Sequence, residues 1–124
     1  MKEIVITAGD VVLSAELNDS PTAQRIWERL PFQAEASTWG DEVYFAIPVE
    51  MDQAADAHAE VEVGTLGYWP MGRAFCIFFG PTPGSTGSKP RAYSPVNIIG
   101  RVTDDATQLR GLKHGASVRV ARAK

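Results

Sequence analysis

A carboxyl group and a phenol stand two residues apart in the segment 42–47, at Glu42 and Tyr44. Apolar and polar residues alternate through this segment, which predicts a β-strand with both side chains on one face. Glu35, on a neighbouring predicted strand, is a further carboxyl group that could lie nearby. A carboxyl beside a phenol is one arrangement suited to general acid–base chemistry. The simpler interpretation is that Glu42 and Tyr44 lie on the solvated outer face of a strand next to a turn.

Large side chains gather in the segment 64–72, whose three glycines and one proline predict a loop. Tyr68, Trp69 and Met71 in this loop could line a ligand cleft, because ring faces provide apolar area while the ring edges carry polar groups. The alternative is that these rings close one end of a small barrel as part of its core. The sequence leaves both interpretations open.

Two arginines flank the apolar run 74–79 and the long irregular segment 80–94. Arg73 and Arg91 could bind a carboxylate or a peptide carbonyl at the rim of a cleft, or could simply face solvent. From these groups and their neighbours we predict a ligand-binding set of Glu42, Tyr44, Phe45, Tyr68, Trp69, Arg73 and Phe75.

Other site chemistries find little support in the residue spacing. Asp52, Asp56 and His58 match no established metal-ligand motif, so no metal site is predicted. Cys76 lies inside an apolar run and is expected to be buried filler rather than a nucleophile. The segment 80–94 lacks the spacing of a phosphate-binding loop, and no cofactor is predicted.

The elements that must position these side chains are mostly strands. Ser20 and Pro21 are a typical helix start, and apolar residues at helical spacing predict one helix with a core-facing stripe. That stripe consists of Ala23, Ile26, Trp27 and Leu30. Strands are predicted at 2–8, 11–17, 32–37, 42–47, 60–63, 74–79, 96–102 and 117–121.

The composition bounds the answer further. The 124 residues suit a single domain over 1–124, and one cysteine excludes an internal disulfide. Twelve basic against fifteen acidic residues give a net charge of −3, which argues against nucleic-acid binding. No apolar run approaches the ~20 residues of a membrane helix, and no signal-peptide pattern opens the chain, so a cytoplasmic protein is expected.

Three segments carry a family resemblance. VVLSAELNDSPTAQRIWERL resembles the opening of cyclophilins, and NIIGRVTDDATQLRGLKHGASVRV resembles their final strands. YWPMGRAFCIFFGPTP is similar to a small bacterial and archaeal cyclophilin-like family, a shortened branch of that fold. The resemblance implies an all-β fold, a closed antiparallel cyclophilin-like barrel of about eight strands with one early helix capping an end.

The resemblance also bears on activity. Cyclophilins that isomerise prolyl bonds carry an arginine in a Phe-His-Arg motif, but the matching stretch 43–48 has Phe45 or a neighbour at that place. An isomerase must stabilise the twisted amide, so its activity here is expected to be weak or absent. We therefore predict binding of a peptide segment or small molecule in an aromatic-lined cleft, by a monomer or weak homodimer.

Two alternatives remain open at this point. The first is an active peptidyl-prolyl isomerase that uses a different donor, with Arg73 the first candidate. The second is an interaction module without a chemical site, acting through the segment 80–94 or by self-association.

Overall fold

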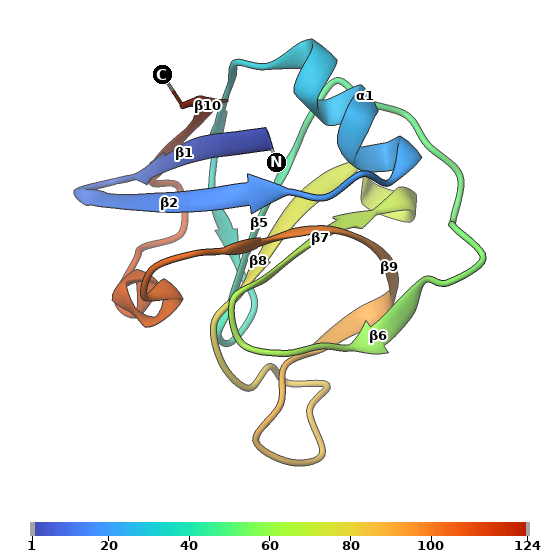
Figure 1. Cartoon of the computed structure of the whole chain (residues 1–124). Coiled ribbons are helices and arrows are strands. Elements are labelled where there is room, and N and C mark those ends of the chain that lie inside the picture. The colour runs from blue at the N-terminus through green and yellow to red at the C-terminus, as the bar shows by residue number, and fades with distance from the viewer. Residues whose placement is uncertain (1, 124) are drawn as a thin grey trace.

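Two segments of alternating apolar and polar residues at the N-terminus form a hairpin in the computed structural model, which describes residues 2–123 (Figure 1). Strand β1 (Lys2–Ala8) pairs antiparallel with β2 (Val11–Leu17). Gly9 takes the left-handed conformation at the turn, with φ of 57°, which glycine adopts without steric cost. Alternate side chains of both strands, such as Ile4 and Leu13, are buried in the core.

The other elements follow in chain order. They are α1 (Pro21–Arg29), β3 (Phe32–Glu35), β4 (Ser37–Thr38), β5 (Glu42–Ala46), β6 (His58–Glu60), β7 (Thr65–Trp69), the 3₁₀ turn η1 (Pro70–Gly72), β8 (Ala74–Phe78), β9 (Arg91–Val102), the 3₁₀ turn η2 (Ala106–Leu109) and β10 (Ser117–Arg122).

Helix α1 begins where its capping residues predict. The Ser20 side chain accepts a hydrogen bond from the Ala23 N–H at 3.2 Å, and a proline occupies the first turn. Ala23 and Ile26 are buried, whereas Trp27 is half-buried at the edge, with the Arg122 guanidinium 4.4 Å from its ring centroid. The helix thus covers one end of the barrel (Figure 1). Among residues 2–123 no helix is long and apolar enough to cross a membrane.

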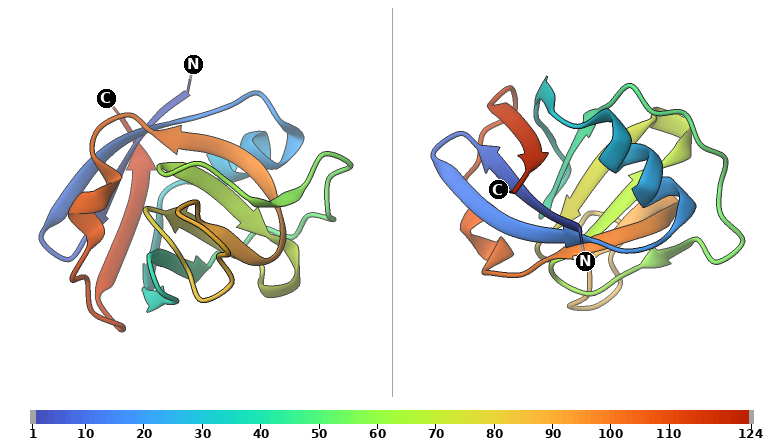
Figure 2. Two further views of the ribbon diagram at one scale, coloured as in Figure 1. Left: turned by 90° about the horizontal axis from the view of Figure 1, so that it is seen from below. Right: turned by 45° about the horizontal axis from the view of Figure 1, so that its top comes forward.

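The strands form a single antiparallel barrel, as predicted. Within the described residues, the barrel is closed by the chain connection between its two end strands and not by hydrogen bonds between them. The hydrogen-bonded order runs β3-β10-β1-β2-β9-β7-β8-β5-β4, and within residues 2–123 no ladder joins its two ends. Those ends are consecutive in the chain, on either side of Ala36: β3 pairs with β10, and β4 pairs with β5 (Figure 2). Ala36 bonds through its N–H and carbonyl to Ala116 and Gly115. The segment therefore changes partner halfway along, and the barrel closes without a continuous ladder.

The structure has ten strands where about eight were expected, and the largest correction is β7. The segment 64–72 was expected to be a loop, yet Thr65–Trp69 lies as a strand between β8 and β9. Glycine disfavours a strand, but here both edges of the strand pair with neighbouring strands. Residue propensities do not include the stabilisation that comes from this pairing. Gly67 also fits closely, since a Cβ there would lie 2.9 Å from the Val96 side chain.

Two further boundaries differ from the prediction. The strand expected at 60–63 lies earlier, as β6, and pairs with the first half of β9. Strand β9 begins at Arg91, inside the segment expected to be irregular, and it curves from β6 to β2 (Figure 1).

The core has two parts, and the smaller one supports the candidate site. The larger cluster fills the barrel interior. A second cluster lies on the outer face of β8, under β6 and the first half of β9; its members are Val61, Ala74, Cys76, Phe78, Ala92 and Val96. Strand β8 is therefore buried on both faces, as its unbroken apolar run predicts, and Cys76 is buried filler.

Candidate functional site

Strand alternation decides which side chains reach the outer face. On β5, Val43 and Phe45 belong to the interior cluster, while Tyr44 packs against the outer one. Glu42 shares the outer side with Tyr44, because residues two apart on a strand point the same way. On β7, Trp69 likewise packs against the outer cluster. The three outer side chains come from strands on either side of β8.

A pocket of about 160 Å³ opens on this outer face. Its lining residues are Trp39, Glu42, Tyr44, Trp69, Ala92, Tyr93 and Val96. A cavity of ~150 Å³ holds one benzene molecule, so this pocket has room for a single ring or a group of similar bulk.

Four aromatic rings form consecutive walls of this pocket. The ring centroids of Trp39 and Tyr93 lie 6.1 Å apart at 75°, and those of Tyr93 and Trp69 lie 6.0 Å apart at 76°. Trp69 and Tyr44 continue the series at 6.4 Å and 85°. Each contact is edge-to-face, the arrangement that aromatic quadrupoles favour. The Trp69 indole N–H donates a 2.6 Å hydrogen bond to the Ser94 hydroxyl, which fixes its ring further.

Glu42 is the one carboxyl group in the lining, and it is only 6% exposed. Burial raises its pKa from 4.5 to about 7, and a hydrogen bond from the Cys76 thiol opposes part of that rise. None of the ion pairs found among residues 2–123 involves Glu42. The expectation of a solvated outer face is wrong for this residue, because β6 and β9 cover the sheet there.

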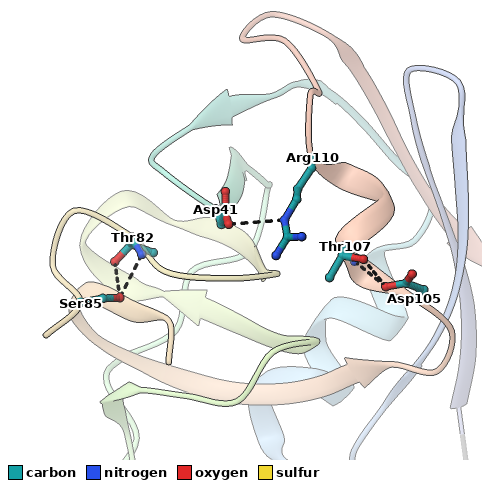
Figure 3. Close-up of polar contacts among 6 residues, drawn as sticks. All are labelled: Asp41, Thr82, Ser85, Asp105, Thr107 and Arg110. Atoms are coloured by element: carbon teal, nitrogen blue, oxygen red, sulfur yellow. Dashed lines mark hydrogen bonds and ion pairs between the residues drawn. The ribbon is translucent and has the colours of Figure 1, made fainter. Parts of the chain in front are cut away.

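The loop between β8 and β9 packs against one wall of the pocket. A Cβ added at Gly84 would lie 3.2 Å from the Trp39 ring, so the loop backbone passes close to that indole. The Thr82 N–H donates to the Ser85 hydroxyl at 2.9 Å (Figure 3). The Thr82 hydroxyl donates to the Arg91 carbonyl. These bonds hold the loop to the start of β9 and support Trp39 from outside.

A second set of polar contacts holds the turn before β5. The Asp41 carboxylate lies 3.7 Å from the Arg110 guanidinium, which follows η2 (Figure 3). Asp105 caps η2 by accepting hydrogen bonds from the Thr107 hydroxyl and, at 2.9 Å, from the Thr107 N–H, and these two bonds lower the pKa of Asp105. The ion pair of Asp41 thus ties the turn that carries Trp39 and leads to Glu42 to the segment just after η2.

The structure brings three of the seven predicted site residues together, namely Glu42, Tyr44 and Trp69. Phe45 and Phe75 stack inside the barrel with ring centroids 5.2 Å apart and do not reach the pocket. Neighbouring residues on a strand face opposite sides, so Phe45 could not accompany Tyr44.

The other two predicted residues lie outside the pocket: Tyr68 points from β7 into the barrel interior, and Arg73 lies in the turn before β8. The Tyr68 hydroxyl is buried and donates a 2.6 Å hydrogen bond to the Val49 carbonyl; burial raises its pKa. Arg73 adopts a left-handed conformation, with φ of 48°, and its exposed guanidinium lies 3.4 Å from the Glu50 carboxylate. Neither residue lines the aromatic pocket.

Sequence reasoning missed four lining residues, most importantly Trp39 and Tyr93. Trp39 lies next to Gly40 in a sequence typical of a turn, and Tyr93 lies in the segment 80–94, which was expected to be irregular. Pro95 interrupts the strand pattern beside Tyr93, because proline lacks the N–H that a central strand needs. The alternation of Ala92 and Val96 around it is too short a signal to reveal β9 by itself.

A larger cavity lies near the start of α1, and the buried side-chain amide of Asn97 in its lining already makes hydrogen bonds within the protein. Asn97 donates to the Thr22 hydroxyl and the Asp52 carbonyl, both at 3.0 Å, and accepts from the Ala54 N–H at 2.8 Å. These bonds fix the segment before β6 to β9. His58 is engaged with the Asp56 carbonyl at 3.0 Å, and within residues 2–123 no three His, Cys, Asp or Glu side chains gather as a metal site.

Comparison with known proteins identifies a family and a similar solved structure. The model of a family described as Cyclophilin-like matches residues 2–121. The solution structure of a hypothetical protein from Archaeoglobus fulgidus is similar, with a TM-score of 0.83 and 36% sequence identity, covering 98% of this chain and 95% of that one. Among curated proteins, none matches this sequence.

Proposed function

The chain belongs to the cyclophilin-like family, and from this premise we propose that it binds a peptide segment or small-molecule ligand in the aromatic pocket. The observation that carries the proposal is the pocket itself: four rings and a buried carboxyl group around a space the size of one small ring. Mostly apolar walls with a single convergent polar group are typical of small-ligand sites.

The rigidity of the walls supports binding. Each ring contacts the next, and the Trp69 indole is hydrogen-bonded to Ser94. Tyr93 is nonetheless 74% exposed, so one wall has apolar surface open to solvent. Rings that are already ordered lose little entropy when a ligand arrives, which favours affinity.

The position of the arginines disfavours prolyl isomerisation. Phe45 or a neighbour stands at the place of the cyclophilin arginine; Phe45 lies in the barrel core, and no arginine is among the pocket-lining residues. Arg73, the first alternative donor, faces Glu50 outside the pocket. Without a donor aimed at the twisted amide, the transition state gains little over the ground state.

Indole N–H resonances provide a direct test. Trp39 and Trp69 line the pocket, whereas Trp27 lies on α1 and serves as an internal control. In a fragment screen followed by two-dimensional NMR, we expect binding fragments to move the first two resonances and leave the third in place. Tyr93→Ala should weaken these fragments, while Val12→Ala, at another exposed apolar position, should not.

Two results would contradict this function. One is a screen in which no fragment moves either pocket indole at millimolar concentration. The other is a set of fragments that bind the folded protein equally well after the Tyr93 ring is removed.

A further inference from the structure

We propose that the ligand of the aromatic pocket carries a methylated ammonium group. The four rings and the Glu42 carboxylate hold this positively charged group. This inference rests on the proposed function and names the chemical class that the pocket recognises.

The rings offer what a diffuse positive charge requires. An aromatic face carries negative potential and attracts a cation placed within about 6 Å of the ring centroid. The rings of Trp39, Tyr93, Trp69 and Tyr44 succeed one another at 75°, 76° and 85°, like the walls of a box. A cation in the space between such walls approaches several rings at once, and tryptophan is the strongest partner among them.

Glu42 supplies an independent observation, a carboxyl group that is 94% buried and has no cation beside it. The described lining residues include no lysine or arginine. The ionised form of Glu42 is costly because it is buried without a counter-charge, so an incoming cation would stabilise that form and be held by it. An anion would meet both the carboxylate and the negative ring faces, and a neutral group would leave the charge uncompensated.

The lining favours a methylated over a plain ammonium group. A primary ammonium is a compact, strongly hydrated charge, and it would lose most of its hydration among lining residues that are mainly aromatic or aliphatic. Ala92 and Val96 add apolar contacts suited to methyl groups. The 160 Å³ volume suits a group about the bulk of a benzene ring, as a trimethylammonium head is.

Recognition of this kind depends on pH through Glu42. Its carboxyl group contacts the Cys76 thiol of β8 and shares the pocket with Tyr44 of β5 and Tyr93 of β9. The preceding residue, Asp41, pairs with Arg110. Burial raises the pKa of the Cys76 thiol, which stays neutral, and that of Glu42 to about 7. Since only the ionised carboxyl attracts the cation, affinity should rise about tenfold between pH 6 and pH 8.

A matched pair of probes tests the charge directly. Choline and its carbon analogue 3,3-dimethylbutan-1-ol have the same shape, but only choline is a cation. We expect choline to move the Trp39 and Trp69 indole resonances with an affinity at least about tenfold above that of the alcohol. Glu42→Gln should lower the affinity for choline more than the affinity for the alcohol, and it should remove the pH dependence of choline binding.

A second variant keeps the test valid if Glu42→Gln does not fold. Tyr93→Leu retains apolar area at an exposed position but removes one ring. It should weaken choline binding more than alcohol binding. Equal loss of both probes would overturn the role of the ring faces.

A final arm identifies where the ammonium group comes from. A short peptide with one trimethyllysine is titrated beside choline: tighter binding of the peptide assigns a side chain, and tighter binding of choline assigns a small molecule. If the alcohol binds as well as choline, or if only neutral or anionic fragments bind, the cation proposal is overturned while the proposed function stands. If no probe or fragment reaches the pocket, both fail.

Discussion

Glu42→Gln should make the folded protein more stable at alkaline pH, an effect opposite to the usual loss on changing a buried residue. Glu42 is 6% exposed, and burial raises its pKa from 4.5 to about 7. The fold therefore favours the neutral acid. The stability that this preference supplies is fully present below pH 4.5 and is lost as the pH rises through about 7.

The magnitude follows from the same two pKa values. A rise from 4.5 to about 7 corresponds to about 3 kcal/mol between the two protonation states. Above pH 8 the wild type carries the whole cost of a buried carboxylate, whereas glutamine has no charge to bury. We expect the variant to exceed the wild type by up to about 3 kcal/mol at pH 8.5 and to match it within about 1 kcal/mol at pH 5.

Urea denaturation of both proteins at pH 5, 6, 7 and 8.5 measures this difference. Taking the difference at each pH removes the contributions of the other titrating groups. Glu35→Gln, an exposed carboxyl on β3, is the matched control and should show a difference that stays constant with pH. A Glu42→Gln difference that is also constant, or a wild type that becomes the more stable protein at pH 8.5, would refute the assignment of Glu42 as a desolvated acid.

Three other outcomes are expected, two from close approaches in the structure and one from the position of the arginines. Gly100→Ala should lower the free energy of unfolding by at least about 2 kcal/mol in thermal or urea denaturation, because the added Cβ would lie 2.0 Å from a β2 carbonyl oxygen. The control Gly87→Ala, in open space, should change the free energy of unfolding by less than about 0.5 kcal/mol. Gly72→Ala should displace the Trp69 ring, 2.5 Å from the added Cβ, and so lower the affinity of any pocket ligand while the far-ultraviolet dichroism stays unchanged. In a protease-free prolyl isomerisation assay the protein should be at least about 10²-fold slower than an efficient isomerase, and Arg73→Ala should not change that rate; a loss of activity on this substitution would revive the isomerase alternative.

The sequence by itself determined the elements whose signals are local. Helix α1 follows from its serine cap, its proline and the 3.6-residue stripe, all within eleven consecutive residues. Strand β5 follows from alternation, and β8 from an unbroken apolar run. These signals act between near neighbours in the chain. The same alternation placed Glu42 and Tyr44 on one face and, with the family resemblance, indicated the barrel.

Only the tertiary structure decided what covers that face. Strand β7 exists because both of its edges are paired, and no local signal in 64–72 reports those partners. Trp39 and Tyr93 are 54 positions apart in the sequence, yet they form adjacent walls because the curvature of β9 brings its first half over the outer face of β8. Glu42 becomes a buried acid for the same reason. Burial depends on which distant segment lies above a residue, and strand pairing between remote segments fixes this, not the pattern of any one of them.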